Sequence, residues 1–323
     1  MSIEDVRRLV AADMTAVDRL IERRLYSEVP LIDRLSHYII RSGGKRLRPV
    51  LTLLSARALG YERGEQHVAL AAVIELIHTA TLLHDDVVDA SNMRRGRKTA
   101  NLVWGNNASV LVGDFLYSRA FQMMVDVDNM RVMNILADAT NTIAAGEVMQ
   151  LSHCHDTGTT LERYLQIINA KTAKLFEAAT HLGAVICAAE ETLQQAMASY
   201  GRYLGLAYQL IDDVLDYSAA SEDLGKNIGD DLAEGKPTLP LLYALWHGSA
   251  EDASAVRIAI EQGGLEHIER VRSAIESTGA IAYTAALAEE QAAAALAALA
   301  PVPPSEYKTA LRALAEFSVH RKS

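Results

Sequence analysis

Proline is absent from residues 50–236 of this 323-residue chain. Proline is the strongest helix breaker, so this long stretch can hold uninterrupted helices. Apolar residues recur in it at helical spacing over 111–125, 133–149, 161–182 and 193–217, whereas alternating strand patterns are scarce. Alanine, leucine, glutamate and glutamine are plentiful, and aromatic residues make up only 6% of the chain. These features predict an all-α fold.

The composition is that of one large folded domain. Hydrophobic residues make up 50% of the chain, which is ample for a substantial core. No serine-, glycine- or proline-rich linker divides the sequence, so we expect a single domain over 1–323. Residues 281–300 are rich in alanine, which predicts a packed outer helix.

Charge, cysteine content and targeting signals restrict the possible functions. The net charge of −10 argues against a general nucleic-acid binder, because phosphate backbones require basic surfaces. Cys154 and Cys187 are too few to form a disulfide framework. Residues 1–14 lack the apolar core of a signal peptide, and no run of about eighteen apolar residues predicts an integral membrane segment. We therefore expect a cytoplasmic protein.

Two acidic clusters with the same spacing each follow a largely apolar segment. On a helix, residues i, i+1 and i+4 lie on one narrow face, so each cluster gathers three carboxylates. One isolated cluster of this kind is more often a solvated surface, but charges at the end of a core-like helix are costly without a partner. The repetition favours a functional role. The first cluster is Asp85, Asp86 and Asp89, and the second cluster is Asp212, Asp213 and Asp216.

The two clusters together predict a magnesium and diphosphate site. Close carboxylates repel one another unless a cation lies between them, and Mg²⁺ typically takes one or two carboxylates together with water and phosphate oxygens. About three Mg²⁺ ions would balance the six carboxylates, and bound diphosphates would then need cations from the protein. Lys171, Lys226 and Lys236 are available for this, as are two basic stretches.

The first basic stretch, 43–49, combines two glycines with three cations and ends in Pro49. Proline is favoured in the first turn of a helix, which would bring Lys45 and Arg48 close to a helix N-terminus, where free N–H groups bind anions. An ordinary basic loop is the alternative. The second stretch, 94–98, has four cations in five residues, and arginine side chains bind phosphate oxygens in pairs.

Other possible ligands are better explained by structure. The run His-Cys-His-Asp at 153–156 contains zinc-ligating residue types, but adjacent ligands lack the spacing of a tetrahedral zinc site. We expect a loop between helices there. His84 precedes the first cluster, and we expect it to make a structural hydrogen bond, with support of a metal ligand as the alternative.

In order along the chain, these motifs resemble the signature of the trans-isoprenyl diphosphate synthases. The order is Gly44-Lys45 with Arg48-Pro49, the first cluster before Arg94-Arg95-Gly96, Lys171-Thr172, Gln209 with the second cluster, and Gly225-Lys226 before Asp230-Asp231. The resemblance runs from about residue 43 to residue 240. Through 78–84 and 235–240 it is greatest to the bacterial octaprenyl diphosphate synthases, which make the ubiquinone side chain. Several separated motifs in the right order are more specific than any one.

The resemblance implies ten or more helices around a deep central cavity, usually in a homodimer. Both clusters would hold Mg²⁺ bridging an allylic diphosphate, with Asp213 in a supporting role. The residues implied to contact the allylic diphosphate are Arg94, Lys171, Lys226 and Lys236. Those implied to bind isopentenyl diphosphate are Lys45, Arg48, His78 and Arg95.

The implied reaction joins isopentenyl diphosphate to an allylic diphosphate, with farnesyl diphosphate as the expected primer. Metal ions and cationic side chains stabilise charge on the leaving diphosphate, the allylic carbon gains carbocation character, and the isopentenyl double bond attacks it. The departing diphosphate is implied to take the released proton, so no side chain is assigned as general base. Thr172 and Gln209 would orient or stabilise the cation, or merely satisfy a neighbouring helix. The implied catalytic residues are the first cluster, Lys171, Thr172, Gln209 and Lys226.

Product length is expected to depend on the helix that carries the first cluster. Ala80 and Thr81 lie about one turn before it and are small, whereas short-chain members of the family place a bulky side chain there. Eight isoprene units at roughly 5 Å each would need a tunnel of about 40 Å, comparable to a long helix. Its floor would lie among Phe121, Met123 and Met124, a group that also fits an ordinary core.

Two other functions share some of these features. A class I terpene cyclase would normally carry an Asn/Asp, Ser/Thr and Glu metal motif in place of the second cluster, and it would lack the pocket of Lys45 and Arg48. A regulatory subunit of a heteromeric prenyl synthase would characteristically lose aspartates, and all six are present here. The sequence therefore favours a catalytic long-chain prenyltransferase.

Overall fold

The computed structural model describes residues 1–40, 43–94, 96–218 and 229–320. Nearly all regular structure in these residues is helical, which confirms the prediction of an all-α fold. The described exceptions are two short strands that follow α5 and pair antiparallel. These strands are β1 (Met93–Arg94) and β2 (Arg97–Lys98).

The chain forms two compact units, each built from several segments. Unit 1 comprises Met1–Thr140, Leu175–Ala198 and Leu299–Ala313, and unit 2 comprises Asn141–Lys174, Ser199–Ala298 and Leu314–Ser323. The helices of unit 1 are α1 (Ile3–Leu9), α2 (Ala11–Leu25), α3 (Pro30–Ile40), α4 (Leu47–Ala58), α5 (Gln66–Val88), α6 (Ala100–Trp104) and α7 (Asn106–Asp126). The helices with residues in both units are α8 (Met130–His153), α10 (Lys174–Ile186), α11 (Glu191–Asp216) and α18 (Glu306–His320). Unit 2 also contains α9 (Leu161–Ile168), a π-helical turn (Asn169–Ala173), α13 (Asp230–Ala233), α14 (Leu239–His247), α15 (Ala250–Gln262), α16 (Ile268–Thr278) and α17 (Ala280–Ala298).

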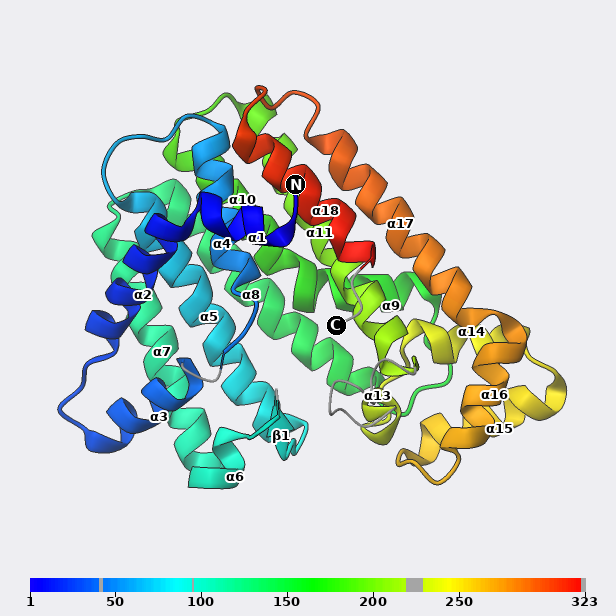
Figure 1. Ribbon diagram of the computed structural model, residues 1–323. Helices are drawn as coiled ribbons and strands as arrows, with labels where there is room; N and C mark the ends of the chain where they lie inside the picture. Colours follow the sequence, from blue (N-terminus) through cyan, green and yellow to red (C-terminus); the bar gives the residue numbers. More distant parts are fainter. Residues whose placement is uncertain (41–42, 95, 219–228, 321–323) are drawn as a thin grey trace. The chain divides into compact units, whose positions relative to one another are not determined.

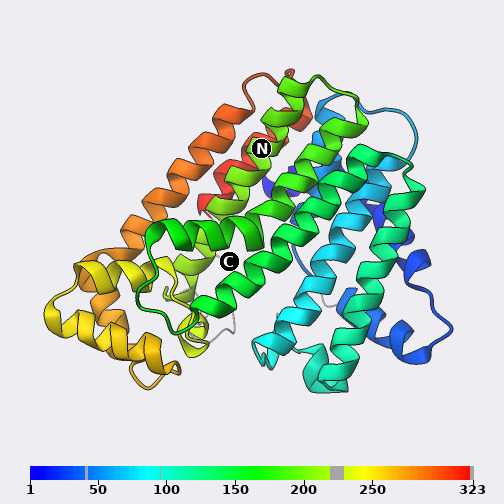
Figure 2. The same cartoon turned by 180° about the vertical axis from the view of Figure 1, so that it is seen from behind.

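Helix α5 is the central helix of unit 1 and packs against α2, α4 and α7 (Figures 1 and 2). Its buried side chains lie around most of its circumference, as expected for a core helix. Among the residues that the structure describes, α5 is the one helix long and apolar enough to cross a membrane by length and composition, and 72% of its apolar window is buried inside the protein. This packing holds the end of α5, and with it the first cluster, in a defined place.

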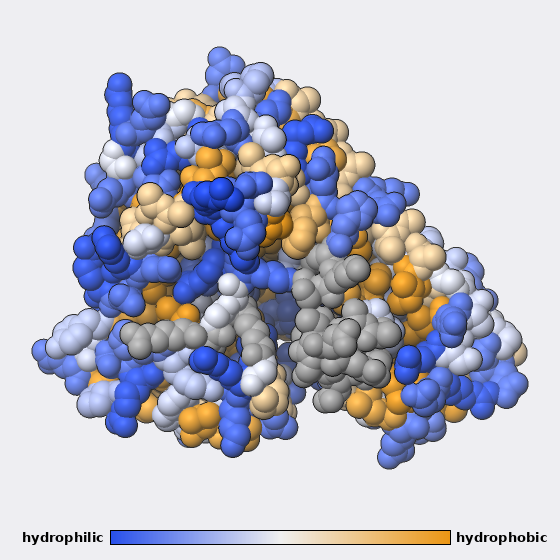
Figure 3. Space-filling view, in the orientation of Figure 1, coloured by the Kyte–Doolittle hydropathy of each residue, from blue (hydrophilic) through white to orange (hydrophobic). Residues whose placement is uncertain are grey.

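Helices α2 and α4 pack on α5 through apolar side chains and polar contacts. Val17, Ile21 and Leu25 follow one another at four-residue spacing on α2 and are buried. Arg57 of α4 binds the Asp13 carboxylate through hydrogen bonds of 2.9 and 2.8 Å, which fixes α2 to α4. Hydrophilic side chains cover much of the α1–α3 side of the surface in Figure 3.

In unit 2, α14 packs against α9, α15, α16 and α17. Pro240 is its second residue, a position where the missing N–H leaves no hydrogen bond unmade. Leu241 and Leu245 join a core formed with α15 and α16, while Leu239 and Leu242 join a second core that contains Tyr164. Helix α14 therefore contributes to both of these cores.

The helical segments expected from apolar spacing are confirmed. Residues 111–125, 133–149 and 193–216 lie within α7, α8 and α11, and most of 281–300 forms α17. The stretch 161–182 is helical throughout, but a π-helical turn separates α9 from α10. Such a turn takes one extra residue, a local change that does not alter the apolar pattern strongly enough to be predicted. The single-domain interpretation stays a prediction.

Candidate active site

The first cluster lies at the C-terminal end of α5. Asp85 and Asp86 belong to its last turn, and Asp89 is the first residue beyond the helix. The helix macrodipole is negative at this end, so three carboxylates there add to an unfavourable field unless cations offset it. A cation close to the cluster would therefore be stabilising.

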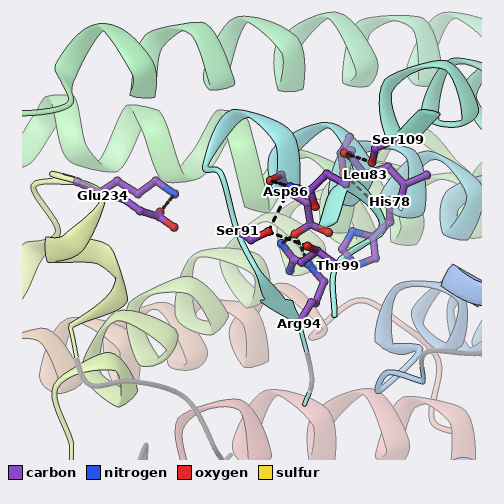
Figure 4. A network of polar contacts seen from close by, with 11 residues as sticks. His78, Leu83, Asp86, Ser91, Arg94, Thr99, Ser109 and Glu234 are labelled. Atoms are coloured by element: carbon purple, nitrogen blue, oxygen red, sulfur yellow. Dashed lines mark hydrogen bonds and ion pairs between the residues drawn. The ribbon is translucent and has the colours of Figure 1, made fainter. Parts of the chain in front are cut away.

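Asp86 is the buried member of the first cluster, with a relative exposure of 0%. Its Oδ1 accepts a hydrogen bond from Nε of Arg94 at 2.7 Å and forms an ion pair with Nη2 of the same guanidinium at 2.7 Å (Figure 4). Its Oδ2 is also buried and has no hydrogen-bond partner among the described residues. The Asn101 side chain donates to the main-chain oxygens of Asp86 and Ser91 at 3.0 and 3.2 Å, which fixes the turn after α5. A buried carboxylate oxygen without a donor is well suited to a metal ion.

The predicted isopentenyl diphosphate residues Arg48 and His78 are brought together in unit 1. Arg48 Nη1 lies 3.2 Å from His78 Nε2, and its guanidinium lies over the Phe176 ring at 4.5 Å from the centroid. Pro49 is in the first turn of α4, as expected. Arg46, one of the three cations of this stretch, instead forms a 3.0 Å ion pair with the buried side chain of Glu75, so its role is structural.

The second cluster lies at the C-terminal end of α11, where the same dipole argument applies. Asp213 is only 1% exposed, and both of its carboxylate oxygens accept hydrogen bonds, from Tyr164 at 2.6 Å and from Gln209 at 2.8 Å. The Thr172 hydroxyl donates to the Gln209 side chain at 2.8 Å. A continuous polar chain thus joins Thr172 to the second cluster. Protein donors therefore occupy both oxygens of Asp213, and its supporting role at the metal stays a prediction.

Burial and mutual repulsion act on the carboxylates of unit 2. Burial, and then the charge of Asp231, raise the pKa of Asp213 well above its ordinary value. The same two causes raise the pKa of Asp216 to about 9. Burial and the Asp213 charge likewise raise the pKa of Tyr164, which keeps its hydroxyl protonated as a donor. These carboxylates therefore have a strong electrostatic preference for a nearby cation.

Lys171 lies in the π-helical turn, next to Thr172. Its ammonium group is 2.7 Å from Glu147 Oε2 and 2.6 Å from Gln150 Oε1, both on α8. Sequence reasoning assigned no role to Glu147, Gln150 or Tyr164. A half-buried lysine requires acceptors, but nothing in the sequence says which helix supplies them.

Lys236 follows the second cluster and is 9% exposed. Its ammonium group forms an ion pair with Glu234, which Figure 4 labels. Arg95 and Lys226, both predicted to contact diphosphate, lie outside the described residues.

The predicted chain-length residues lie on α5 and α7, two helices that pack together. Ala80 is fully buried, and Thr81 is half-buried with its hydroxyl donating to the His78 carbonyl at 2.8 Å. Met123 and Met124 are buried on α7. Phe121, on the same helix, is half-buried with its ring centroid 5.8 Å from that of Tyr117. Their role in product length stays a prediction.

Within the described residues, no group of three or more His, Cys, Asp or Glu side chains converges closely enough to hold a metal ion by itself. The assignment of the two clusters to Mg²⁺ stays a prediction. In the run 153–156, Nδ1 of His153 and of His155 each bond a main-chain oxygen, at 2.8 and 2.9 Å. Nε2 of His84 lies 3.2 Å from the Val110 oxygen.

Comparison with known proteins decides the family. A family model described as polyprenyl synthetase matches residues 29–278. The chain belongs to the polyprenyl synthetase family. It is 50% identical over 322 residues to octaprenyl diphosphate synthase of Haemophilus influenzae, covering 99% of this chain and 98% of that protein. It is 54% identical over 263 residues to the Escherichia coli protein of the same name, covering 81% of each.

A solved structure gives the same result for the fold. The crystal structure of polyprenyl synthase from Caulobacter crescentus, complexed with calcium and isoprenyl diphosphate, matches with a TM-score of 0.95 and 47% identity, covering 100% of this chain and 98% of that chain. The predictions of an isoprenoid synthase fold and of a prenyltransferase that makes long-chain trans-polyprenyl diphosphates are confirmed. These relatives favour neither a terpene cyclase nor a regulatory subunit.

Proposed function

We propose that this prenyltransferase adds isopentenyl diphosphate to farnesyl diphosphate and releases octaprenyl diphosphate for a quinone side chain. The observation that carries the proposal is the pair of intact aspartate clusters, each at the negative end of a long helix. Arg94 pairs with Asp86 of the first cluster, and the polar chain from Thr172, the neighbour of Lys171, reaches Asp213 of the second. The names of two relatives with 50% and 54% identity support eight as the number of isoprene units.

Magnesium fits the residues present. Asp86 offers a buried oxygen that lacks a donor among the described residues, and the raised pKa of Asp216 reflects charge that a cation would relieve. We propose that Asp85, Asp86, Asp89, Asp212 and Asp216 hold about three Mg²⁺ ions, with Asp213 supporting them. When bound, Mg²⁺ supplies positive charge against the departing diphosphate.

The cationic side chains would bind the two diphosphates. Lys171, Lys236 and Arg94 would bind the allylic diphosphate, and Glu147 with Gln150 would hold the Lys171 ammonium in place for this. Lys45, Arg48 and His78 would bind the diphosphate of isopentenyl diphosphate. Arg95 would also bind the diphosphate of isopentenyl diphosphate, and Lys226 would also bind the allylic diphosphate. This assignment is electrostatic throughout and needs no nucleophilic side chain.

Thr172 is proposed to face the carbon that becomes cationic. Its hydroxyl proton is directed to Gln209, so the oxygen lone pairs remain available to the cation. Gln209 in turn donates to Asp213, which sets the direction of the whole chain of hydrogen bonds. The oxygen dipoles would stabilise positive charge without reacting with it.

We further propose a cytoplasmic homodimer. Helices α6 and α7 of unit 1 expose several large apolar side chains, among them Leu111 at 66% and Val125 at 64%. Exposed apolar groups on neighbouring helices are typical of a surface covered by a partner. Sedimentation velocity would give twice the mass of the chain, and a monomer at micromolar concentration would contradict this part of the proposal.

The test of the function is a product assay. Purified protein is incubated with Mg²⁺, farnesyl diphosphate and labelled isopentenyl diphosphate, and the dephosphorylated products are separated by chain length. We expect octaprenol as the main product and no elongation after chelation of Mg²⁺. A folded, magnesium-supplied protein that elongates nothing, or that converts farnesyl diphosphate alone into a hydrocarbon, would refute the proposal.

A further inference from the structure

The segment that leads to Lys236 is tied to the second cluster through the main chain. The Gly229 N–H donates to the Asp216 carbonyl oxygen at 3.1 Å, and the Asp231 N–H donates to the Asp216 carboxylate at 3.3 Å. The Lys236 N–H then donates to the Asp231 carbonyl oxygen at 2.9 Å. The path of residues 229–236 therefore sets where the main chain of Lys236 lies relative to the second cluster, and the ion pair with the neighbouring Glu234 holds the ammonium group on this same segment.

The imidazole ring of His155 covers Gly235, the residue directly before Lys236. Gly235 has a φ of +68°, and a Cβ atom added to it would lie 2.2 Å from Cε1 of His155. The His155 N–H also donates to the Gly235 carbonyl oxygen at 2.7 Å. The ring thus occupies the space of a side chain at position 235 and limits the movement of this otherwise permissive glycine.

His155 is itself held from a third segment. Its Nδ1 lies 2.9 Å from the Ile260 carbonyl oxygen near the end of α15. A carbonyl oxygen can only accept, so Nδ1 is the nitrogen that carries the proton. A Cβ atom added to Gly263 would lie 3.1 Å from the ring. The His155 backbone is left-handed, with φ of +62°, a costly conformation for a residue other than glycine that persists only where the surroundings hold it.

We infer that His155 is a positioning residue for Lys236. The ring joins the loop after α8, the glycine before Lys236 and the end of α15, so its loss would free Gly235 and let the ammonium group move. A displacement of about 1 Å is enough to weaken a charge-assisted contact severely. The inference rests on the proposed function, in which Lys236 binds the allylic diphosphate.

The test measures binding and requires no turnover. Isothermal titration calorimetry of the full chain with Mg²⁺ and farnesyl thiodiphosphate, an allylic diphosphate analogue that resists ionisation, gives a dissociation constant for each variant. We expect His155→Ala and Lys236→Ala each to weaken binding about tenfold. The double variant should bind no more weakly than the single variant that binds more weakly, because both changes act on the same contact. His155→Asn keeps a residue that tolerates the left-handed backbone, lacks the ring, and should match His155→Ala.

Two further variants distinguish a specific effect on the position of Lys236 from a nonspecific disturbance of the fold. His153→Ala is the matched control, because the His153 ring bonds the Met149 oxygen within α8, and it should bind within twofold of the wild type. Gly235→Ala should weaken binding through the clash with the ring, and adding His155→Ala should recover part of that loss. Circular dichroism confirms that each variant is folded.

Unchanged binding in folded His155→Ala and His155→Asn, or additive losses of about a hundredfold in the double variant, would overturn the inference. The outcome is separable from that of the proposed function. Elongation by the wild type without coupling between His155 and Lys236 removes only the positioning role, whereas coupling without elongation removes only the proposed reaction. Absence of analogue binding by the wild type would overturn both.

Discussion

Removal of the Tyr164 hydroxyl should destabilise the protein measurably. In Tyr164→Phe, the Asp213 carboxylate loses a 2.6 Å hydrogen bond at a place where both side chains are nearly inaccessible, at 3% and 1% exposure. Leaving a buried acceptor without its donor costs about 1–3 kcal/mol, and no water can replace the lost donor without rearrangement. The ring itself remains, so no cavity is made. We expect the free energy of unfolding to fall by about 1–3 kcal/mol, equivalent to a drop of roughly 2–10 °C in Tm.

The assay is urea unfolding of the metal-free protein, followed by circular dichroism and repeated by thermal scan. Tyr203→Phe is the matched control, because Tyr203 is a half-buried tyrosine on α11 whose ring packs against Arg202 and the core that contains Tyr164, and whose hydroxyl makes no hydrogen bond within the described residues. It should change the unfolding free energy by less than about 0.5 kcal/mol. Equal stability of Tyr164→Phe and Tyr203→Phe would refute the reasoning that Asp213 depends on a buried donor.

Three further predictions concern the clusters and the product. Arg94→Ala leaves Asp86 buried without its partner and should lower the free energy of unfolding of the metal-free protein by about 3 kcal/mol in urea unfolding. Arg94→Lys should lower it less, and equal stability of Arg94→Ala and the wild type would contradict the prediction. Thr81→Tyr, and Ala80→Phe where it folds, should shorten the products in the chromatographic assay, and unchanged lengths in both would remove these positions from the tunnel wall. The pKa of Asp216 is raised from 3.8 to about 9, so the folded state binds the extra proton, and stability should be full below about pH 4 and lost as pH rises towards 9. Between pH 6 and 8 the free energy of unfolding of the metal-free protein should fall by up to about 2.7 kcal/mol, and added Mg²⁺ should reduce this fall. An equally steep decline in Asp216→Asn would contradict the prediction.

Much of the fold followed from local patterns. Helical spacing of apolar residues and the absence of proline placed α7, α8 and α11, because both signals act within a few turns of chain. The fit of Pro49 to the first turn of α4 is equally local. The π-helical turn before α10 could not be predicted, since it changes one hydrogen-bond step and leaves the apolar face intact.

The candidate site divides in the same way. The aspartates were visible because their spacing repeats, and Arg48 with His78 could be named through the family resemblance. The partners that hold them were not visible, because Glu147 and Tyr164 are joined to their targets only by tertiary packing, over 24 and 49 residues of chain. Likewise, His155 looked like part of a loop until the folded chain placed its ring against Gly235.

A crystal structure of the full chain with Mn²⁺ in place of Mg²⁺ and farnesyl thiodiphosphate tests the central claim most directly. Anomalous scattering should locate metal ions within coordination distance of carboxylates from both clusters, Asp85 and Asp212 among them, around one diphosphate. Metal ions bound at only one cluster, or a diphosphate that touches neither, would contradict the account.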